Sequence, residues 1–366
     1  MTNRRLISNF NWWFFIAILL LSVVGVVIIN SANHGRPEPF FRDLYIKQIY
    51  WILCGLVAML LALIIDYRKL SRYAYVIYGI TALALVYVLI NGVVASGAKR
   101  WIYIGSTTVQ VSEFAKIALI LALAKFFESG KAQGQYTLKD LWIPATLTGI
   151  IGLLIAVQPD LGTAIIIFLI FLVFVIVIEI DGAVLAQIFG VGVLIAPLFW
   201  FLLKDYQKRR VLTLFNPELD PLGAGYHLIQ SKIAIGSGGF SGKGLFMGTQ
   251  SRLNFLPENH TDFIFSVFAE ETGFIGVLIL LGLYLFIILK GLNIAFRATD
   301  RFGLFLALGT ISSISFYALI NIGMTIGFFP ITGLPLPLLS YGGSSLITNF
   351  FALGLLLNIE MRRIAH

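Results

Sequence analysis

The sequence predicts an all-α polytopic membrane protein with about ten transmembrane helices, and two observations support this class. First, hydrophobic residues make up 58% of the 366-residue chain and charged residues only 12%, whereas a soluble domain keeps about 25% charged residues to solvate its surface. Second, the apolar residues form runs long enough to cross a bilayer, since a membrane helix needs about 20 of them. Together they indicate that the solvent of this chain is lipid.

The predicted spans follow one another along most of the chain. They lie near residues 12–29, 48–65, 73–91, 111–127, 141–157, 161–179, 183–203, 262–289, 302–328 and 341–359. The first is predicted to be a retained helix rather than a cleaved signal peptide, because no small-residue cleavage site accompanies it. The fifth and sixth are separated by "QPDLG" (158–162), which predicts a tight turn.

The distribution of Lys and Arg predicts that both termini are cytoplasmic. Positive residues favour cytoplasmic loops. They are more frequent in the short loops on the side of the termini, including Arg68, Lys69, Arg72, Lys290 and Arg297, than in those on the other side. The net charge of +8 is therefore interpreted as a topology signal and an attraction to anionic lipid. No motif or long basic run predicts nucleic-acid binding.

We expect one integral membrane domain, residues 1–366, with a single long outer loop. This loop, about 204–261, lies between the seventh and eighth spans and contains apolar residues at intervals, such as Tyr206, Leu214 and Ile229. Long loops are usually either functional or disordered. The apolar residues disfavour disorder here, so the loop is expected to be ordered and to pack on the membrane face. The chain has one cysteine, Cys54, which excludes an intrachain disulfide and a thiol metal site.

Two stretches of the outer loop are candidates for binding an anion. "GSGGFSGKG" (236–244) is not a Walker A loop, because Gly244 follows Lys243 where Ser or Thr is required. Glycines with one lysine can still bind a phosphate, and the alternative is a tight-turning loop. In "KDYQKRRV" (204–211), Arg210 offers a bidentate fork to an anionic headgroup. The alternative for this second stretch is an interfacial patch of snorkelling side chains.

Charged residues near the ends of membrane spans are also candidates. Glu113 and Lys116 share one helix face in "VSEFAKIALI", and each charge costs about 2.5–3.5 kcal/mol to insert. They either form a neutralised pair that locks helices together or line a polar cavity. Asp160, in "QPDLG", lies at an outer edge, where it either caps a helix or contributes to a site.

The segment "GFFPITGLPLPLLSYGGSS" (327–345) lacks charge and is rich in Pro and Gly. Irregular backbone at membrane depth is tolerated where it is buried in protein or lines a cavity. The composition therefore favours a re-entrant or broken segment at the outer face, with Ser340 and Tyr341 as its polar side chains. An ordinary loop is the alternative.

Asp262 ends a polar run just where the eighth span begins, in "PENHTDFIFSVFAEETG" (257–273). It is either a helix cap or a functional acid. Arg100, Asp160, Asp262, the long loop and the 327–345 segment all fall on the outer side of the predicted topology. This convergence predicts a site for an amphiphile with an anionic head and a lipid tail. Glu270 and Glu271, two turns further on, are expected to be structural or to act on the site through another residue.

With these residues the chain resembles the SEDS family of bacterial cell-wall polymerases over nearly its whole length. The resemblance is carried by "GAKRWI" (97–102), "SEFAKI" (112–117), "QPDLGTA" (158–164), "DYQKRRV" (205–211), "GAGYHLIQSKIAIGSGG" (223–239), "NHTDFIF" (259–265), "EETGFIG" (270–276) and "PLPLLSYGGSS" (335–345). "GLPLP" before "LSYGG" favours the rod-shape branch over the division branch. Val111 departs from the family, whose members often carry proline before "SE".

The resemblance implies a ten-helix fold and a peptidoglycan glycosyltransferase of the bacterial cytoplasmic membrane, with its active site facing the periplasm or cell exterior. The implied substrate is lipid II, and the growing glycan stays on undecaprenyl pyrophosphate. The implied partners are a class B penicillin-binding protein and other proteins of the elongation complex. The rival functions are a lipid II flippase, for which no matching inner-side set of polar residues is found, and a scaffold that only positions the penicillin-binding protein.

The resemblance also places the essential aspartate at Asp262, as the general base of an inverting transfer. The leaving pyrophosphate requires positive charge, and the candidates for it are Arg100, Lys116, Arg210, Lys232 and Lys243. Glu113 is expected to orient Lys116. A divalent cation, Mg or Mn, could share this work, although the chain has no separate Asp-x-Asp motif.

Overall fold

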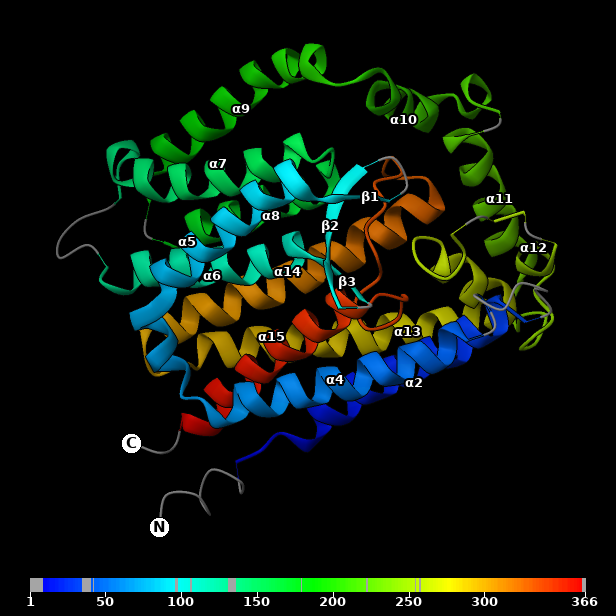
Figure 1. The fold of residues 1–366 in the computed structure, drawn as a ribbon, viewed down its shortest axis with the longest axis horizontal. Helices are drawn as coiled ribbons and strands as arrows, with labels where there is room; N and C mark the ends of the chain where they lie inside the picture. Colours follow the sequence, from blue (N-terminus) through cyan, green and yellow to red (C-terminus); the bar gives the residue numbers. More distant parts are fainter. Residues whose placement is uncertain are drawn as a thin grey trace.

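The computed structural model describes residues 9–34, 41, 43–95, 98–105, 107–130, 136–178, 180–221, 223–253, 255–256 and 258–363. The chain ends, which the sequence predicts to be cytoplasmic, fall partly outside these ranges. Figure 1 shows a bundle of long helices that lie side by side along its longest axis.

Every predicted span corresponds to a helix. These are α2 (Trp12–Ala32), α4 (Leu44–Ile64), α5 (Tyr67–Asn91), α6 (Val111–Glu128), α7 (Trp142–Val157), α8 (Leu161–Val177), α9 (Gly182–Leu202), α13 (Ile264–Phe296), α14 (Arg301–Ile326) and α15 (Gly343–Arg362). Within the described residues, seven helices are long and apolar enough to cross a membrane. Helix α6 carries four charged residues, and α8 is a shorter apolar helix. The polytopic helical class is confirmed.

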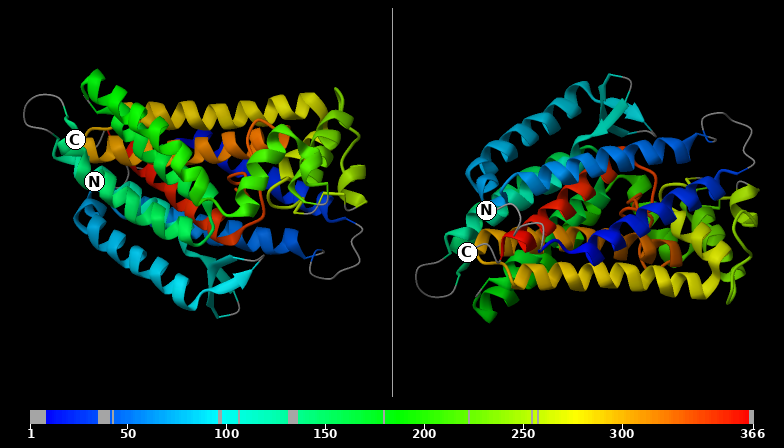
Figure 2. Two further views of the ribbon diagram at one scale, coloured as in Figure 1. Left: turned by 90° about the horizontal axis from the view of Figure 1, so that it is seen from above. Right: turned by 90° about the horizontal axis from the view of Figure 1, so that it is seen from below.

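One end of the bundle joins the beginning and the end of the described chain. The Asn11 amide donates hydrogen bonds of 3.0 Å to both carboxylate oxygens of Glu360, and Lys290 lies 3.4 Å from the same carboxylate. Arg362 pairs with Asp66 at 3.3 Å. The start of α2, the end of α13 and the end of α15 therefore meet at one end, as Figures 1 and 2 show.

Helices α14 and α15 form the centre of the bundle, since 78% and 72% of their apolar windows are buried. Small residues let the helices approach closely, which is how membrane helices gain contact without a hydrophobic driving force. A methyl group added at Gly354 of α15 would lie 2.9 Å from Cβ of Ala62 and 3.0 Å from Cα of Met59 on α4. The pair α4 and α15 therefore packs backbone against backbone.

A small antiparallel sheet at the other end was not predicted from the sequence. Its strands β1 (Val93–Ala95), β2 (Ala98–Ile104) and β3 (Thr107–Gln110) lie between α5 and α6. Trp101 pairs with Gln110, and Tyr103 with Thr108. Aromatic and β-branched residues favour a strand here, and the sheet carries Arg100 toward the start of α8.

The long outer loop is ordered over its described residues, as the sequence predicts. It folds into α10 (Asp205–Phe215), the 3-10 turn η2 (Pro217–Leu219), α11 (Ala224–Ser237) and the short α12 (Thr249–Arg252). A second 3-10 turn, η1 (Leu138–Leu141), precedes α7. In Figure 1, α10, α11 and α12 lie at the same end of the bundle as the sheet and the segment between α14 and α15.

Candidate active site

Asp262 lies on a turn that is hydrogen-bonded to the segment between α14 and α15. The hydroxyl of Ser340 donates to the carbonyl of Thr261 at 2.6 Å, and the backbone N–H of Tyr341 donates to the carbonyl of His260 at 2.9 Å. Ser340 is buried, and burial raises the pKa of the Tyr341 phenol. The 327–342 stretch is non-helical, as the sequence favours; residues 331–342 are buried or half-buried, whereas Phe328 and Phe329 are exposed.

The carboxylate of Asp262 does not serve as a helix cap. Phe263 occupies the cap position of α13, and no side chain makes a capping hydrogen bond there. Across the turn lies Gly333, whose φ is +75°. A methyl group added at Gly333 would lie 3.4 Å from Oδ2 of Asp262, so this carboxylate faces the backbone of residues 331–334.

The surroundings of Asp262 weaken its acidity. Burial among protein atoms, the largest cause, and the negative charge of Glu258 together raise the pKa of Asp262 to about 6. The charges of Arg210 and Arg100 and a hydrogen bond with Thr261 oppose this rise. Because the side chain keeps a partial opening to solvent, a proton can still be exchanged with water.

Arg210 projects from α10 onto the same backbone segment. Its Nη1 donates to the carbonyl of Ile331 at 3.2 Å, and its guanidinium lies 5.8 Å from the ring centroid of Tyr206. Stacking near an aromatic ring and a bond to a carbonyl fix the direction of a planar guanidinium. Arg210 therefore presents a fixed positive charge beside Asp262.

A large apolar cavity opens next to Arg210. It has a volume of about 680 Å³ and is lined by α7, α8, the start of α10 and residues 330–332, with Arg210 at its polar edge. Lining residues Leu153 and Phe168 are 67% and 51% exposed, so the cavity opens on the outer faces of α7 and α8. Its shape and lining suit a hydrocarbon chain whose charged head lies near Arg210.

Arg100 and Asp160 meet at the start of α8, on the rim of this cavity. Arg100 donates from Nε to the carbonyl of Gln158 at 3.1 Å and also bonds to the carbonyl of Pro159. Its Nη1 lies 4.0 Å from Oδ1 of Asp160. Asp160 also caps α8, since its side chain accepts from the N–H of Thr163 at 3.3 Å. Asp160 therefore both caps α8 and lies beside Arg100.

Glu113 and Lys116 lie deeper, inside the helix bundle. The Lys116 Nζ is 2.8 Å from Oε2 of Glu113, and both side chains are almost fully buried. Tyr317 of α14 and Thr348 of α15 each lie 3.4 Å from a carboxylate oxygen of Glu113. The pair therefore ties α6 to its neighbours, as the structural alternative predicts.

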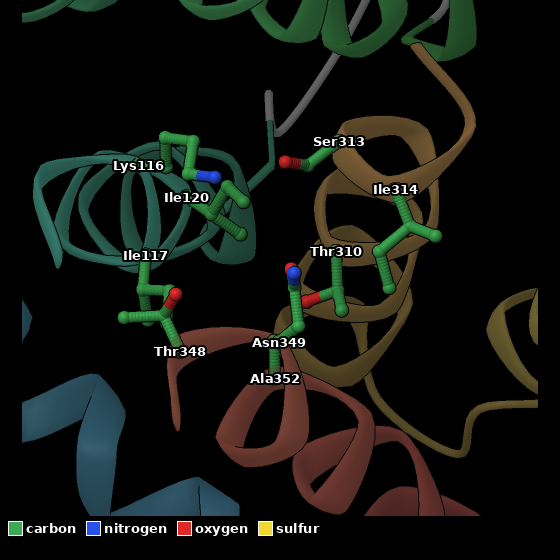
Figure 3. A pocket seen from close by; sticks show the side chains of 9 residues that line it. All are labelled: Lys116, Ile117, Ile120, Thr310, Ser313, Ile314, Thr348, Asn349 and Ala352. Atoms are coloured by element: carbon green, nitrogen blue, oxygen red, sulfur yellow. The ribbon is translucent and has the colours of Figure 1, made fainter. Parts of the chain in front are cut away.

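A small cavity with both polar and apolar lining adjoins Lys116, and Figure 3 shows the residues around it. The cavity lies between α6, α14 and α15, and the polar side chains of Thr310, Ser313, Thr348 and Asn349 border it. Its volume is about 10 Å³, the size that accommodates about one water molecule. A water here would give the buried ammonium a further partner.

The stretch 236–244, called the glycine loop below, forms backbone hydrogen bonds to helix α13 where that helix is broken. Gly273 has φ +66° and ψ −165°, which interrupts the helix. The N–H groups of Phe274 and Ile275 bond instead to the carbonyls of residues 239 and 240, at 3.0 and 3.2 Å. The carbonyls of Glu270 and Glu271 accept from the N–H groups of residues 243 and 244, both at 3.0 Å. The loop satisfies backbone groups that the break would leave unpaired.

Lys243 takes part in this support. Its Nζ lies 2.7 Å from Oε1 of Glu270 and 2.8 Å from the hydroxyl of Thr249. The Glu270 carboxylate also accepts from the N–H groups of Thr249 and Gln250, at 2.8 and 3.3 Å. Lys232 of α11 lies against Gly327, at the end of α14. Neither lysine contacts Asp262 in the interactions of the described residues.

Two residues near Asp262 were not predicted. Asn321 of α14 donates to the carbonyl of Asp262 at 2.9 Å, and an Asn within an apolar span is a signal that could have identified it. His227 of α11 has its ring 6.2 Å from that of Phe263. Burial lowers the pKa of His227; a histidine inside the long-loop helix was its only sequence signal.

The sequence leaves open a divalent cation that would neutralise part of the charge of the leaving pyrophosphate. Across the part of the chain that the structure describes, no three His, Cys, Asp or Glu side chains gather to hold an ion. The acids that act on each other here are Asp262 and Glu258. An Mg²⁺ or Mn²⁺ ion bound here would be expected to take part of its coordination from substrate phosphates.

The fold and site define a multi-pass membrane protein whose polar site lies beside a lipid-accessible cavity. Residues 11–364 match the family model FTSW_RODA_SPOVE, described as "Cell cycle protein". The chain belongs to this family, also called SEDS. It is 44% identical to the peptidoglycan glycosyltransferase MrdB of Escherichia coli K12 over 94% of this chain and 92% of that protein. It is 35% identical to the peptidoglycan glycosyltransferase RodA of Treponema pallidum over 98% and 99%.

Solved structures share the fold. A chain from a peptidoglycan synthase complex that coordinates polymerization and crosslinking is similar with a TM-score of 0.82 and 34% identity, over 98% of this chain and 99% of that one. The rod-shape-determining protein RodA of Thermus thermophilus is similar with a TM-score of 0.71 and 29% identity, over 97% and 98%. The RodA-like fold predicted from the motifs is confirmed.

Proposed function

We propose that this chain polymerises lipid II into β-1,4 glycan strands for lateral wall elongation, with Asp262 as the general base. The enzyme class, peptidoglycan glycosyltransferase, follows from the family and its curated relatives. The observation that carries the finer proposal is the position of Asp262 and Arg210. Both adjoin residues 331–333, and Arg210 and Ile331 line an apolar cavity large enough for an isoprenoid segment.

The proposed transfer inverts the anomeric centre in one step. The 4-hydroxyl oxygen of the incoming GlcNAc attacks C1 of the donor sugar, and Asp262 takes the hydroxyl proton. The bond from C1 to the pyrophosphate oxygen breaks on the opposite face, and undecaprenyl pyrophosphate leaves with the bonding electrons. A base with a pKa of about 6 is mostly ionised at neutral pH and still accepts a proton well.

Positive charge must meet the leaving pyrophosphate. Arg210 and Arg100 are the cations whose charge acts on Asp262, so we assign them this role. Lys116 and Lys243 are held by Glu113 and Glu270 and are expected to act through structure. Lys232 would act only if the pyrophosphate extends toward Gly327.

The remaining predicted residues act through others in this proposal. Ser340 and Tyr341 hold the turn of Asp262, Glu113 orients Lys116, and Asp160 holds Arg100 at the rim. The protein would lie in the bacterial cytoplasmic membrane with its termini inside and its site outside. Its partner would be a class B penicillin-binding protein, in line with the similar chain from a synthase complex.

The test is glycan polymerisation from purified lipid II. Wild type and Asp262→Asn are compared, each alone and with the cognate penicillin-binding protein, whose transpeptidase is blocked. Strands from wild type and none from a folded Asp262→Asn variant are the expected result. Equal strand synthesis by both would mean that the base lies elsewhere, and Asp160 would be tested next.

The same material separates the rival functions. If neither protein makes strands with its partner but lipid II crosses reconstituted vesicles, the protein is a flippase. If wall synthesis persists in cells carrying Asp262→Ala but fails when the surface for the penicillin-binding protein is changed, the chain acts as a scaffold.

A further inference from the structure

Asn321 connects the turn of Asp262 to the segment that follows α14. Its side chain is fully buried. Its Nδ2 donates to the carbonyl of Asp262 at 2.9 Å and to the carbonyl of Leu334 at 2.7 Å. Both partners are carbonyl oxygens, which only accept, so the amide nitrogen must face them. The amide oxygen is then left buried with no partner among the described residues.

The segment that Asn321 holds also anchors Arg210. The Ile331 carbonyl accepts from Arg210 at 3.2 Å, and three residues later the Leu334 carbonyl accepts from Asn321. Between them, Gly333 faces the carboxylate of Asp262. Asp262 and Arg210 are therefore attached to one short backbone stretch, the first through Asn321 and the second directly.

We propose that Asn321 is a positioning residue that sets the separation between the carboxylate of Asp262 and the guanidinium of Arg210. The inference rests on the proposed function. In an inverting transfer the base and the cation act on opposite sides of the reacting carbon, so their separation has to match the donor and acceptor. A misplacement of about 1 Å can cost 10²-fold in rate.

The test compares Asn321→Leu with the matched change Asn358→Leu. Asn358 of α15 is also buried, and its Nδ2 donates to the carbonyls of Ala62, Leu63 and Ile65 at 2.7–2.9 Å, at the other end of the bundle. Asn321→Leu is expected to lower kcat for lipid II about 10- to 100-fold, with KM nearly unchanged. Asn358→Leu is expected to lower Tm and to leave kcat near wild type.

A second readout is the pH profile, which loss of stability alone does not move. Asp262 faces Glu258, Arg210 and Arg100. Without Asn321 the turn of Asp262 is no longer held to Leu334, and the carboxylate of Asp262 becomes more exposed to solvent. The pKa of Asp262 then falls toward its ordinary value, so the acid limb of kcat in Asn321→Leu should move to lower pH. If Asn321→Leu does not fold, Asn321→Ala is used, because it removes both donors without adding bulk or a buried charge.

The inference is overturned if Asp262→Asn is inactive while the folded Asn321 variant keeps the kcat and the pH profile of wild type. It is also overturned if the Asn321 and Asn358 variants lose activity in the same proportion to their loss of Tm. Failure of the proposed function looks different, since Asp262→Asn would then make strands at the wild-type rate.

Discussion

The ammonium of Lys116 lies 3.8 Å from the ring centroid of Tyr317, and the hydroxyl of Tyr317 approaches Glu113. Nearer the rim of the site, the hydroxyl of Thr163 donates to Asp160 at 3.0 Å, and Asp160 lies 4.0 Å from Arg100. Polar side chains therefore lie both in the interior of the bundle and at the rim of the site. The charge of Lys116 is satisfied by a carboxylate and by an aromatic face.

Breaking the Glu113–Lys116 pair from one side should destabilise the protein more than replacing both residues. A single Glu113→Gln or Lys116→Met change leaves one buried charge unpaired, which costs about 3–5 kcal/mol. The double variant removes both charges and should recover a large part of this loss. The measurement is a double-mutant cycle on Tm in detergent.

The control for this cycle is Tyr317→Phe, which keeps the ring beside Lys116 and removes only the hydroxyl. It should cost less than either single charge change. Strictly additive losses of Tm in the double variant would contradict the assignment of a coupled pair.

Asp262→Asn should raise Tm at pH 7.5 and have little effect near pH 4. The folded pKa is about 6 and the ordinary value is 3.8, so the folded state holds the proton more tightly. Wild type therefore loses stability as pH rises from about 4 to 6, and at neutral pH the ionised carboxylate destabilises the folded state. The gain should be on the order of 1–3 kcal/mol. A lower Tm at pH 7.5 would show that the carboxylate stabilises the fold.

Arg210→Gln should move the acid limb of the pH–rate profile to higher pH. Arg210 lowers the pKa of Asp262, so its removal lets that pKa rise and protonates the base at a higher pH. The profile of kcat/KM measures the effect in the free enzyme. Arg209→Gln, at the exposed neighbouring position, should leave the limb unmoved. An equal shift in both variants would indicate a general surface effect.

Glu270→Gln should loosen the glycine loop. The carboxylate accepts from Lys243, Thr249 and Gln250, and hydrogen bonds to charged groups are worth about 1.5–3 kcal/mol each. Faster amide exchange across residues 239–250 and a lower Tm are expected. Glu218→Gln, on the exposed 3-10 turn of the same outer loop, is the matched control. Unchanged exchange in Glu270→Gln would mean that the loop is held by its backbone bonds alone.

The spans were predictable because run length and hydrophobicity are local properties of the chain. The boundaries of α7 and α8, separated by "QPDLG", agree with the predicted runs to within two residues. The sheet was not predicted, because β1 to β3 occupy a short connection whose pairing depends on a hairpin around Gly105. The break at Gly273 was hidden inside an apolar run, and its partners lie in a loop 30 residues earlier.

The site was predictable in part. Charge at a membrane edge pointed to Asp160, Asp262 and Arg210, since such charges are costly unless they have a partner or a function. By sequence, Lys243 is an equally good candidate cation, and only the structure shows that it forms an ion pair with Glu270. The apolar cavity could not be predicted, because four separate stretches of chain build its walls.

The cavity between α7, α8 and α10 opens sideways, onto faces that lipid covers. A substrate whose tail enters there stays in the membrane throughout and arrives by diffusion in two dimensions. Encounters are then set by the number of substrate molecules per unit area of bilayer, rather than per volume of buffer. Spreading a fixed amount of lipid II through more inert phospholipid should slow turnover, whereas adding buffer should not. Under the proposed function, the surface density of lipid II in the membrane would therefore set the rate of encounter.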